Sequence, residues 1–382
     1  MLDFTAAWRF SRGAGQRVAV IDTGVAPDLR LPALVPGGDY VSTSDGLSDC
    51  DVHGTLVAGL IAAAPSPNDG FAGVAPDATI ISIRQNSASF SAQGNGTSQT
   101  DPNALSSGYG NTFTLALAVA HAVDIGATVI NLSEVACAPT ASGLDDAALG
   151  QSVRYAFEHN VVVVAAAGNV NANGLCRTQN GEHDPNLSIE DAWKSVSTVA
   201  SPAWFDDYVL TVGSVAPDGH PSDFSLHGPW IDVAAPGENV TSLGPNGIGL
   251  INAIPNAQGG LAEINGTSFA AALVSGEVAL VRSRFPQLSA AEVMDRVKRT
   301  AHTPEQGPNT ATGYGVVDPV AAVTDDILPS TGVPDSALAH PIAAPPRPSV
   351  DHRMLHIVLS VLGACLAVAL IATLLIGKPQ ER

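Results

Sequence analysis

The chain has 382 residues, 45% of them apolar, so it is long enough and apolar enough to bury a large core and is not a disordered chain. Its 36 acidic and 17 basic side chains give a formal net charge of −19 at pH 7. A surface of that sign repels phosphate backbones, and because the sequence contains no basic run, we expect no nucleic-acid partner.

From residue 17 onward, short apolar runs alternate with helical patterns. The strand-like runs are continuous, which is typical of a parallel sheet covered on both faces. They cover residues 17–21, 78–83, 127–132, 161–167 and 208–215. The helix-like runs cover residues 54–64, 113–126, 148–160, 268–285 and 289–301. This alternation predicts an α/β domain with a mainly parallel central sheet.

The first strand-like run ends in Asp-Thr-Gly, within the stretch RVAVIDTGV of residues 17–25. Aspartic peptidases carry this tripeptide at their active site, but they need two carboxylates that share one site. The chain has no second Asp-Thr-Gly or Asp-Ser-Gly; a homodimer could supply one, but the parallel α/β pattern fits that all-β class badly. The other interpretation makes Asp22 the acid of a serine-hydrolase triad, held at the carboxyl edge of the sheet, where α/β sites form.

Two later motifs supply candidate partners for Asp22. The stretch DVHGTLVAG places His53 where a loop meets a helix of small residues, and INGTSFAAA places Ser268 at the start of another helix. Asp, His, Ser is one of the orders in which the triad occurs. In such a triad Ser268 attacks a peptide carbonyl, His53 takes its proton, and Asp22 fixes the imidazole tautomer.

The oxyanion formed by this attack needs hydrogen-bond donors. The backbone N–H of Ser268 is one candidate, at the positive end of a helix dipole. The side-chain amide of Asn169, which follows the run VVVVAAAGN, is the second. Each motif alone is explained as simply by a turn or a helix cap. Their joint occurrence, in this order and on these elements, favours the triad.

The four cysteines form neither a CxxC pair nor a zinc-ligand spacing. No loop rich in alternating Asp and Asn suggests calcium. We therefore expect no metal and no cofactor. Cys137 and Cys176 lie in polar, loop-like sequence, which suggests a disulfide and an oxidising compartment, with two free thiols as the alternative.

Three segments depart from the α/β pattern. Residues 86–111 are polar and predict an exposed insertion. Residues 327–353 are rich in proline and predict a semi-rigid linker. Residues 354–377 are apolar all round and long enough to cross a bilayer, so we expect a transmembrane helix, followed by a short tail at 378–382. Basic residues flank this segment on both sides, so charge alone gives no orientation.

At the catalytic motifs the chain resembles the subtilisin-like serine proteases, the subtilases. The stretches VAVIDTGV, HGTLVAG, AAAGN and NGTSFAA look like the Asp, His, oxyanion-Asn and Ser motifs of that family. The similarity covers about residues 17–323 and closes with GYGVVDPVAAV. The resemblance implies a subtilisin-like three-layer fold, a catalytic domain over residues 17–326, and endopeptidase activity on a protein substrate.

Within that family the chain is most similar to the mycosins, which are membrane-anchored proteases of type VII secretion systems. The features that carry this resemblance include DCDVHGT, NLSEVACAP, the polar insertion and the apolar C-terminal segment. It implies a single-pass protein of the cell membrane whose catalytic domain lies on the extracytoplasmic side. It also implies a type VII secretion membrane complex as partner. The protease would stabilise this complex and process its substrates.

Two other functions are compatible with parts of this pattern. The chain could be a mainly structural subunit of the secretion complex, with dispensable proteolysis, because an intact triad does not say which role the cell needs. An esterase could use the same triad, but the absence of a Gly-x-Ser-x-Gly elbow argues against the usual esterase frame.

Mycosins carry a signal peptide and an N-terminal extension that wraps the catalytic domain. Residues 1–16 resemble a remnant of that extension. In the family, a cysteine at the position of Cys50, beside His53, is expected to pair with one in the extension. We therefore expect the natural coding sequence to begin upstream of Met1.

The sequence departs from the family pattern at three places. Val52 replaces the Gly usual before the catalytic His, where it could crowd the loop, and Ala272 replaces a Pro usual after the nucleophile. We expect activity to survive both. The stretch NLSEVAC replaces the Gly-containing strand that binds substrate in ordinary subtilases, so Ser133 and Glu134 are candidate substrate-binding residues, and Glu134 is a candidate for altered specificity.

Overall fold

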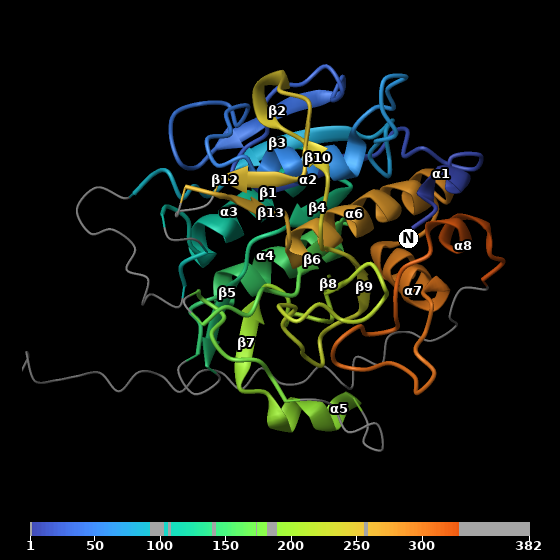
Figure 1. Cartoon of the computed structure of the whole chain (residues 1–382). Coiled ribbons are helices and arrows are strands. Elements are labelled where there is room, and N and C mark those ends of the chain that lie inside the picture. The colour runs from blue at the N-terminus through green and yellow to red at the C-terminus, as the bar shows by residue number, and fades with distance from the viewer. Residues whose placement is uncertain are drawn as a thin grey trace, which may run out of the picture. The chain divides into compact units, whose positions relative to one another are not determined.

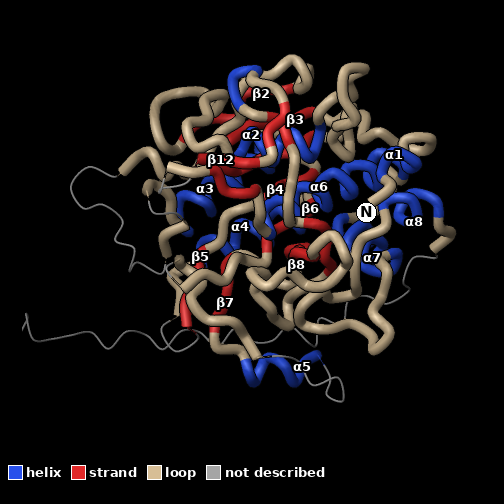
Figure 2. The backbone as a smooth tube through the Cα atoms, viewed as in Figure 1, coloured by secondary structure: helices blue, strands red, loops and turns tan. Residues whose placement is uncertain are grey.

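The computed structural model describes residues 2–91, 103–105, 108–139, 143–172, 174–181, 189–255 and 259–327 (Figures 1 and 2). The chain divides into two units, residues 1–333 and 334–382, and the second lies wholly outside the described part. Among the described residues no helix combines the length and the apolar character needed to cross a membrane. The transmembrane helix expected at 354–377 lies outside them, as does most of the linker.

A seven-stranded sheet forms the centre of the fold, with the strand order β2-β3-β1-β4-β6-β8-β9. All of its neighbouring strands are parallel, which confirms the predicted parallel sheet. Its strands are β1 Arg17–Asp22, β2 Leu34–Asp39, β3 Thr79–Arg84, β4 Val129–Leu132, β6 Val162–Ala166, β8 Val209–Val215 and β9 Val233–Pro236.

Two of these strands, β2 and β9, were not predicted from the sequence. β2 contains a Pro-Gly-Gly sequence that usually interrupts a strand. Gly37 is needed there, because a Cβ at this position would lie 2.6 Å from a methyl of Ile81 and 2.7 Å from Ile83 on the neighbouring strand. β9 is the short sequence VAAP, which follows an aspartate and ends in proline, so no continuous apolar run marks it as a strand.

Helices cover both faces of the sheet (Figure 1). The longer ones match the five predicted helical runs. They are α2 His53–Ala62, α3 Thr112–Asp124, α4 Ala147–Glu158, α6 Thr267–Arg284 and α7 Ala290–Thr300. The short elements are α1 Phe4–Ala7, α5 Ile189–Ala192, α8 Pro319–Thr324, the 3₁₀ turns Trp193–Ser195 and Pro245–Gly247, and the strands β5 Ala136–Pro139, β7 Thr198–Ser201, β10 Ser242–Leu243, β11 Leu250–Ile251, β12 Ala253–Pro255 and β13 Leu261–Glu263.

The side chains of β1 show how the sheet separates two cores. Val18 and Val20 point to one face, where they join the buried residues of α2 and α6. Ala19 and Ile21 point to the other face, where they join α3 and α4. Because successive residues of a strand alternate between faces, a continuous apolar run serves both cores at once. The result is a three-layer arrangement of helices, sheet and helices.

Helix α6 runs through the first of these cores and is buried along most of its length. One of its residues, Glu277, carries a carboxyl group that is 0% exposed, and neither oxygen has a hydrogen-bond partner within the described residues. Burial raises the pKa of Glu277 well above its ordinary value, and the nearby Asp318 adds to this rise. A buried carboxyl without a partner is held in its neutral form.

We predict that Glu277→Gln stabilises the protein above neutral pH. The folded chain holds a proton on Glu277 that the unfolded chain releases, so stability is lost as pH rises from the unfolded pKa through the raised folded one. The amide is neutral at every pH, so the variant should gain about 1–2 kcal/mol at pH 8. Thermal unfolding between pH 5 and pH 8 measures this. The exposed Glu305→Gln is the control, and equal pH dependence in parent and Glu277→Gln would contradict the prediction.

Candidate active site

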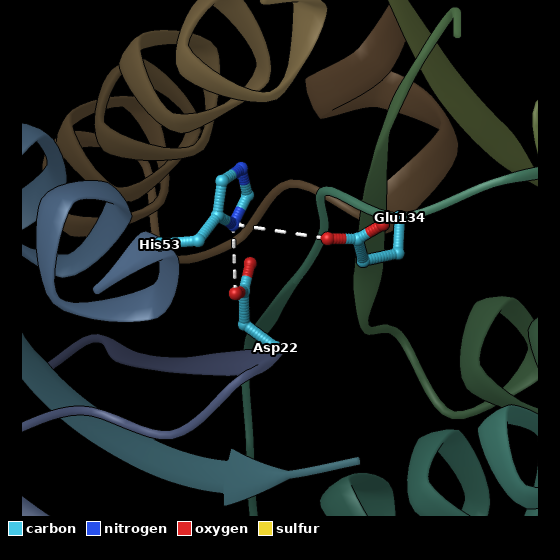
Figure 3. A group of neighbouring side chains, drawn as sticks. All are labelled: Asp22, His53 and Glu134. Carbon is cyan, nitrogen blue, oxygen red and sulfur yellow. Dashed lines mark hydrogen bonds and ion pairs between the residues drawn. The ribbon is translucent and has the colours of Figure 1, made fainter. Parts of the chain in front are cut away.

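The site begins with Asp22, the last residue of β1, whose carboxylate is fully buried. Its Oδ1 accepts a hydrogen bond from the backbone N–H of Thr23 at 2.7 Å and lies 2.8 Å from Nδ1 of His53, the first residue of α2 (Figure 3). Gly54 allows the helix to come this close, because a Cβ there would lie 2.1 Å from the carbonyl oxygen of Gly24. The predicted acid and base are therefore hydrogen-bonded.

A second carboxylate, that of Asp49, organises the loop before α2. Its Oδ1 accepts hydrogen bonds from the Thr23 hydroxyl and from the backbone N–H groups of Asp51 and Val52. Its Oδ2 accepts from the backbone N–H and the hydroxyl of Thr55, in the first turn of α2. Asp49 thus joins the end of β1, the loop and the helix that carries His53.

Val52 lies between this network and His53 with φ at 74°, in the left-handed region. A β-branched residue rarely adopts this conformation, because its Cβ approaches the following carbonyl. Glycine, which has no Cβ, adopts this backbone angle without strain. The hydrogen bond from the Val52 N–H to Asp49, 2.8 Å long, helps to hold the strained backbone in place.

Ser268 is the second residue of α6 and lies in the same cleft as His53, a hollow of about 380 Å³. The aromatic ring of its neighbour Phe269 packs against the His53 imidazole, with centroids 5.3 Å apart. The Ser268 hydroxyl donates to the backbone carbonyl of Ser133 at 3.1 Å, and no hydrogen bond to His53 is present among the described residues. The Ser268 hydroxyl is therefore directed at the Ser133 carbonyl and not at the imidazole.

Asn169 lines the same cleft and is fixed by the start of α6. Its Oδ1 accepts from the backbone N–H of Thr267 at 2.9 Å and from the Thr267 hydroxyl at 3.0 Å. The Thr267 hydroxyl in turn accepts from the backbone N–H of Gly168 at 3.2 Å. These bonds use the carbonyl end of the amide and leave the Nδ2 hydrogens available as donors.

The loop that follows Asn169 is tied down by a disulfide between Cys137 on β5 and Cys176. The backbone N–H of Asn171 donates to the carbonyl of Cys176 at 2.8 Å, which closes the loop. The disulfide expected from the sequence is therefore present, and it anchors the segment beside the cleft. Cys50 is exposed and forms no disulfide within the described part of the chain.

A third acidic residue, Glu134, reaches the histidine from the loop between β4 and β5. Its Oε1 lies 3.9 Å from Nδ1 of His53 (Figure 3). Burial of the ring works against its charge, but the hydrogen-bonded Asp22 and then Glu134 outweigh this effect and raise the pKa of His53 to about 10. Burial raises the pKa of Glu134 to about 7, against the opposing charge of His53. Both carboxylates therefore favour the charged form of the imidazole.

Asp22, His53 and Glu134 bring potential ligand atoms within 4.8 Å of one another. The Nδ1–H of His53 is donated to Asp22, so this nitrogen has no lone pair to offer a metal ion. We interpret the group as a histidine held by a hydrogen bond to Asp22 with the charge of Glu134 nearby, and assign no metal to it.

The structure therefore brings His53, Ser268, Asn169 and the two residues Ser133 and Glu134 to one cleft. Sequence reasoning missed the role of Asp49, although the Asp four residues before His53 was visible in DCDVHGT. It also missed the contact between Glu134 and His53, because no sequence spacing links the start of α2 to the loop after β4.

Comparisons of the sequence and of the fold with known proteins point to the same family. A model described as the subtilase family matches residues 13–315. Mycosin-4 of Mycobacterium tuberculosis (strain ATCC 25618 / H37Rv) is 51% identical, over 100% of this chain and 81% of that protein. The crystal structure of MycP1 from the ESX-1 type VII secretion system has a TM-score of 0.80 at 45% identity, covering 86% of this chain and 85% of that one. A chain in the structure of an intact ESX-5 inner membrane complex has a TM-score of 0.78 at 42% identity, covering 99% and 88%.

We predict that Val52→Gly is more stable than Val52→Ala by about 1 kcal/mol, because both lose the valine side chain but only glycine relieves the left-handed strain. Denaturant unfolding of the two variants measures the difference. The matched pair Val57→Gly and Val57→Ala, in the interior of α2, should show the opposite order by about 1 kcal/mol. The idea of strain at residue 52 fails if the alanine variant is the more stable one at both positions.

Proposed function

Because this chain belongs to the subtilase family of serine proteases, and within it to the mycosins, we propose that Asp22, His53 and Ser268 are its catalytic triad. The chain is a serine endopeptidase, and its activity needs a nucleophile, a base and an orienting acid in one cleft. The observation that carries the assignment is the 2.8 Å hydrogen bond between Asp22 and His53, beside Ser268 at the helix start.

In the proposed reaction, the Ser268 hydroxyl turns from the Ser133 carbonyl to Nε2 of His53 and attacks the scissile carbonyl. His53 accepts the hydroxyl proton and later gives it to the leaving amine. Asp22 holds the Nδ1–H and stabilises the imidazolium that forms. The Nε2 atom is the ring nitrogen on the side away from the two carboxylates, as this reaction requires (Figure 3).

The oxyanion is stabilised by two donors. One is the backbone N–H of Ser268, which belongs to the first turn of the 18-residue α6 and so lacks a helical acceptor. The other is Nδ2 of Asn169, whose orientation is fixed by its bonds to Thr267. We assign Ser133 and Glu134 to substrate binding, because both line the cleft beside the nucleophile.

We place this activity at the membrane complex of a type VII secretion system. Support comes from the chain's similarity, at 42% identity, to a chain in the intact ESX-5 inner membrane complex. In this proposal residues 354–377 are the single transmembrane helix, joined by the linker 327–353 to the catalytic domain 17–326. The disulfide between Cys137 and Cys176 favours an extracytoplasmic position for that domain.

We predict that Ser268→Ala abolishes labelling by a serine-directed fluorophosphonate and cleavage of the secreted proteins of the chain's own organism. Asn169→Ala should keep the nucleophile but slow hydrolysis ~10²–10³-fold, because it removes one oxyanion donor. Gel-based labelling and mass spectrometry of the digests measure the two effects. Equal labelling of Ser268→Ala and the parent would remove Ser268 from the reaction.

A second prediction separates processing from scaffolding. In a strain that lacks its own copy of the gene, the parent chain should restore secretion of processed substrate, whereas Ser268→Ala at equal abundance should not. The exposed Glu305→Gln variant controls for expression. Full restoration of secretion by Ser268→Ala would instead favour the alternative, a mainly structural subunit with dispensable proteolysis.

A further inference from the structure

We propose that Glu134 is a positioning residue of the triad. It is a second negatively charged partner of His53, and it keeps the catalytic base protonated up to a higher pH. The inference rests on the function proposed for His53 and adds a regulator of that same site. It assigns to Glu134 an action on the enzyme's own histidine, in addition to any contact with substrate.

The geometry places two carboxylates on one nitrogen. The Oδ1 of Asp22 lies 2.8 Å from Nδ1 of His53, and the Oε1 of Glu134 lies 3.9 Å from the same atom. Figure 3 shows the two groups reaching this side of the ring from different parts of the chain, with Nε2 on the other side. Since the Nδ1–H is donated to Asp22, Glu134 acts on the ring through its charge.

Asn86 lowers the pKa of Glu134 through a hydrogen bond, and His53 is the cation that acts on this carboxylate. The side chains of His53 and Glu134 are each 24% exposed, so water screens the pair only in part. Among the described residues that line the cleft there is no lysine and no arginine. The neighbouring element α6 contributes the uncharged Ser268 and Phe269.

The other titratable groups around the ring are also acidic. They are Asp22 at the end of β1 and, in the loop before α2, Asp49, which acts on His53, and Asp51, which acts on Glu134. Asp49 accepts the hydrogen bonds of its own loop, and Asp51 accepts from Ser87 and Ser89. Within this group Asp22 and Glu134 form ion-pair contacts with the ring, and of these two Glu134 is the one that lines the cleft.

Two opposite consequences follow from one charge. At rest, Glu134 stabilises the imidazolium, so at a given pH fewer molecules hold a free base. During the reaction, the same charge stabilises the imidazolium that forms as Ser268 attacks. Removal of the charge should therefore make the base available at lower pH and also lower the maximal rate reached at high pH. A merely structural role for Glu134 would move the rate without moving the pH midpoint.

The test is the rate of Ser268 labelling by a fluorophosphonate as a function of pH, in the purified full chain. For Glu134→Gln we expect the midpoint of the rise to move about one pH unit lower or more, and the plateau to fall several-fold. Glu263→Gln is the matched control, because Glu263 lines the same cleft and forms no ion pair with His53. Glu134→Asp, which keeps the charge on a shorter side chain, should lie between the parent and Glu134→Gln.

An unchanged midpoint in Glu134→Gln overturns the proposal and leaves the triad intact. If Glu134→Gln fails to fold, the midpoint of Glu134→Asp decides in the same way. If the parent is not labelled at any pH, the proposed function fails instead. The role of Glu134 is then measured by NMR titration of ¹³C-labelled histidine, with the His53 signal identified by its loss in His53→Ala. If His53 titrates with the same midpoint in Glu134→Gln as in the parent, the proposed role of Glu134 is rejected.

Discussion

The carboxylate of Asp49 is the constraint on which the geometry of the site depends. Its five hydrogen bonds join the residue after β1, the loop and the first turn of α2. Burial raises the pKa of Asp49, and the hydrogen bonds from Thr55 oppose that rise. Since these bonds also hold Val52 in its strained conformation, His53 enters α2 with its ring already directed at Asp22.

The parallel sheet explains why residues so distant in sequence meet. In parallel strands the carboxyl ends lie at one edge, so the segments that follow β1, β4 and β6 are neighbours there. Asp22 ends β1, Glu134 follows β4, and Asn169 follows β6. Helices α2 and α6 begin at the same edge and add His53 and Ser268. The side chains of the proposed site thus gather at one rim of the sheet.

Much of this could be predicted from the sequence, because strands buried on both faces produce continuous apolar runs and the helices that carry His53 and Ser268 begin at recognisable motifs. β2 could not, since Gly37 is dictated by the space beside Ile81 and not by strand propensity. The left-handed angle at Val52 was also hidden, because valine gives no local sign of it. The hydrogen bond from Ser268 to Ser133 depends on side-chain torsions that sequence spacing does not determine.

The bonds between Thr267 and Asn169 have a mechanical consequence. Thr267 immediately precedes Ser268, so two hydrogen bonds link the proposed nucleophile to the amide of Asn169, the proposed oxyanion donor. A displacement of the start of α6 that keeps these two bonds therefore carries the Asn169 amide along with Ser268.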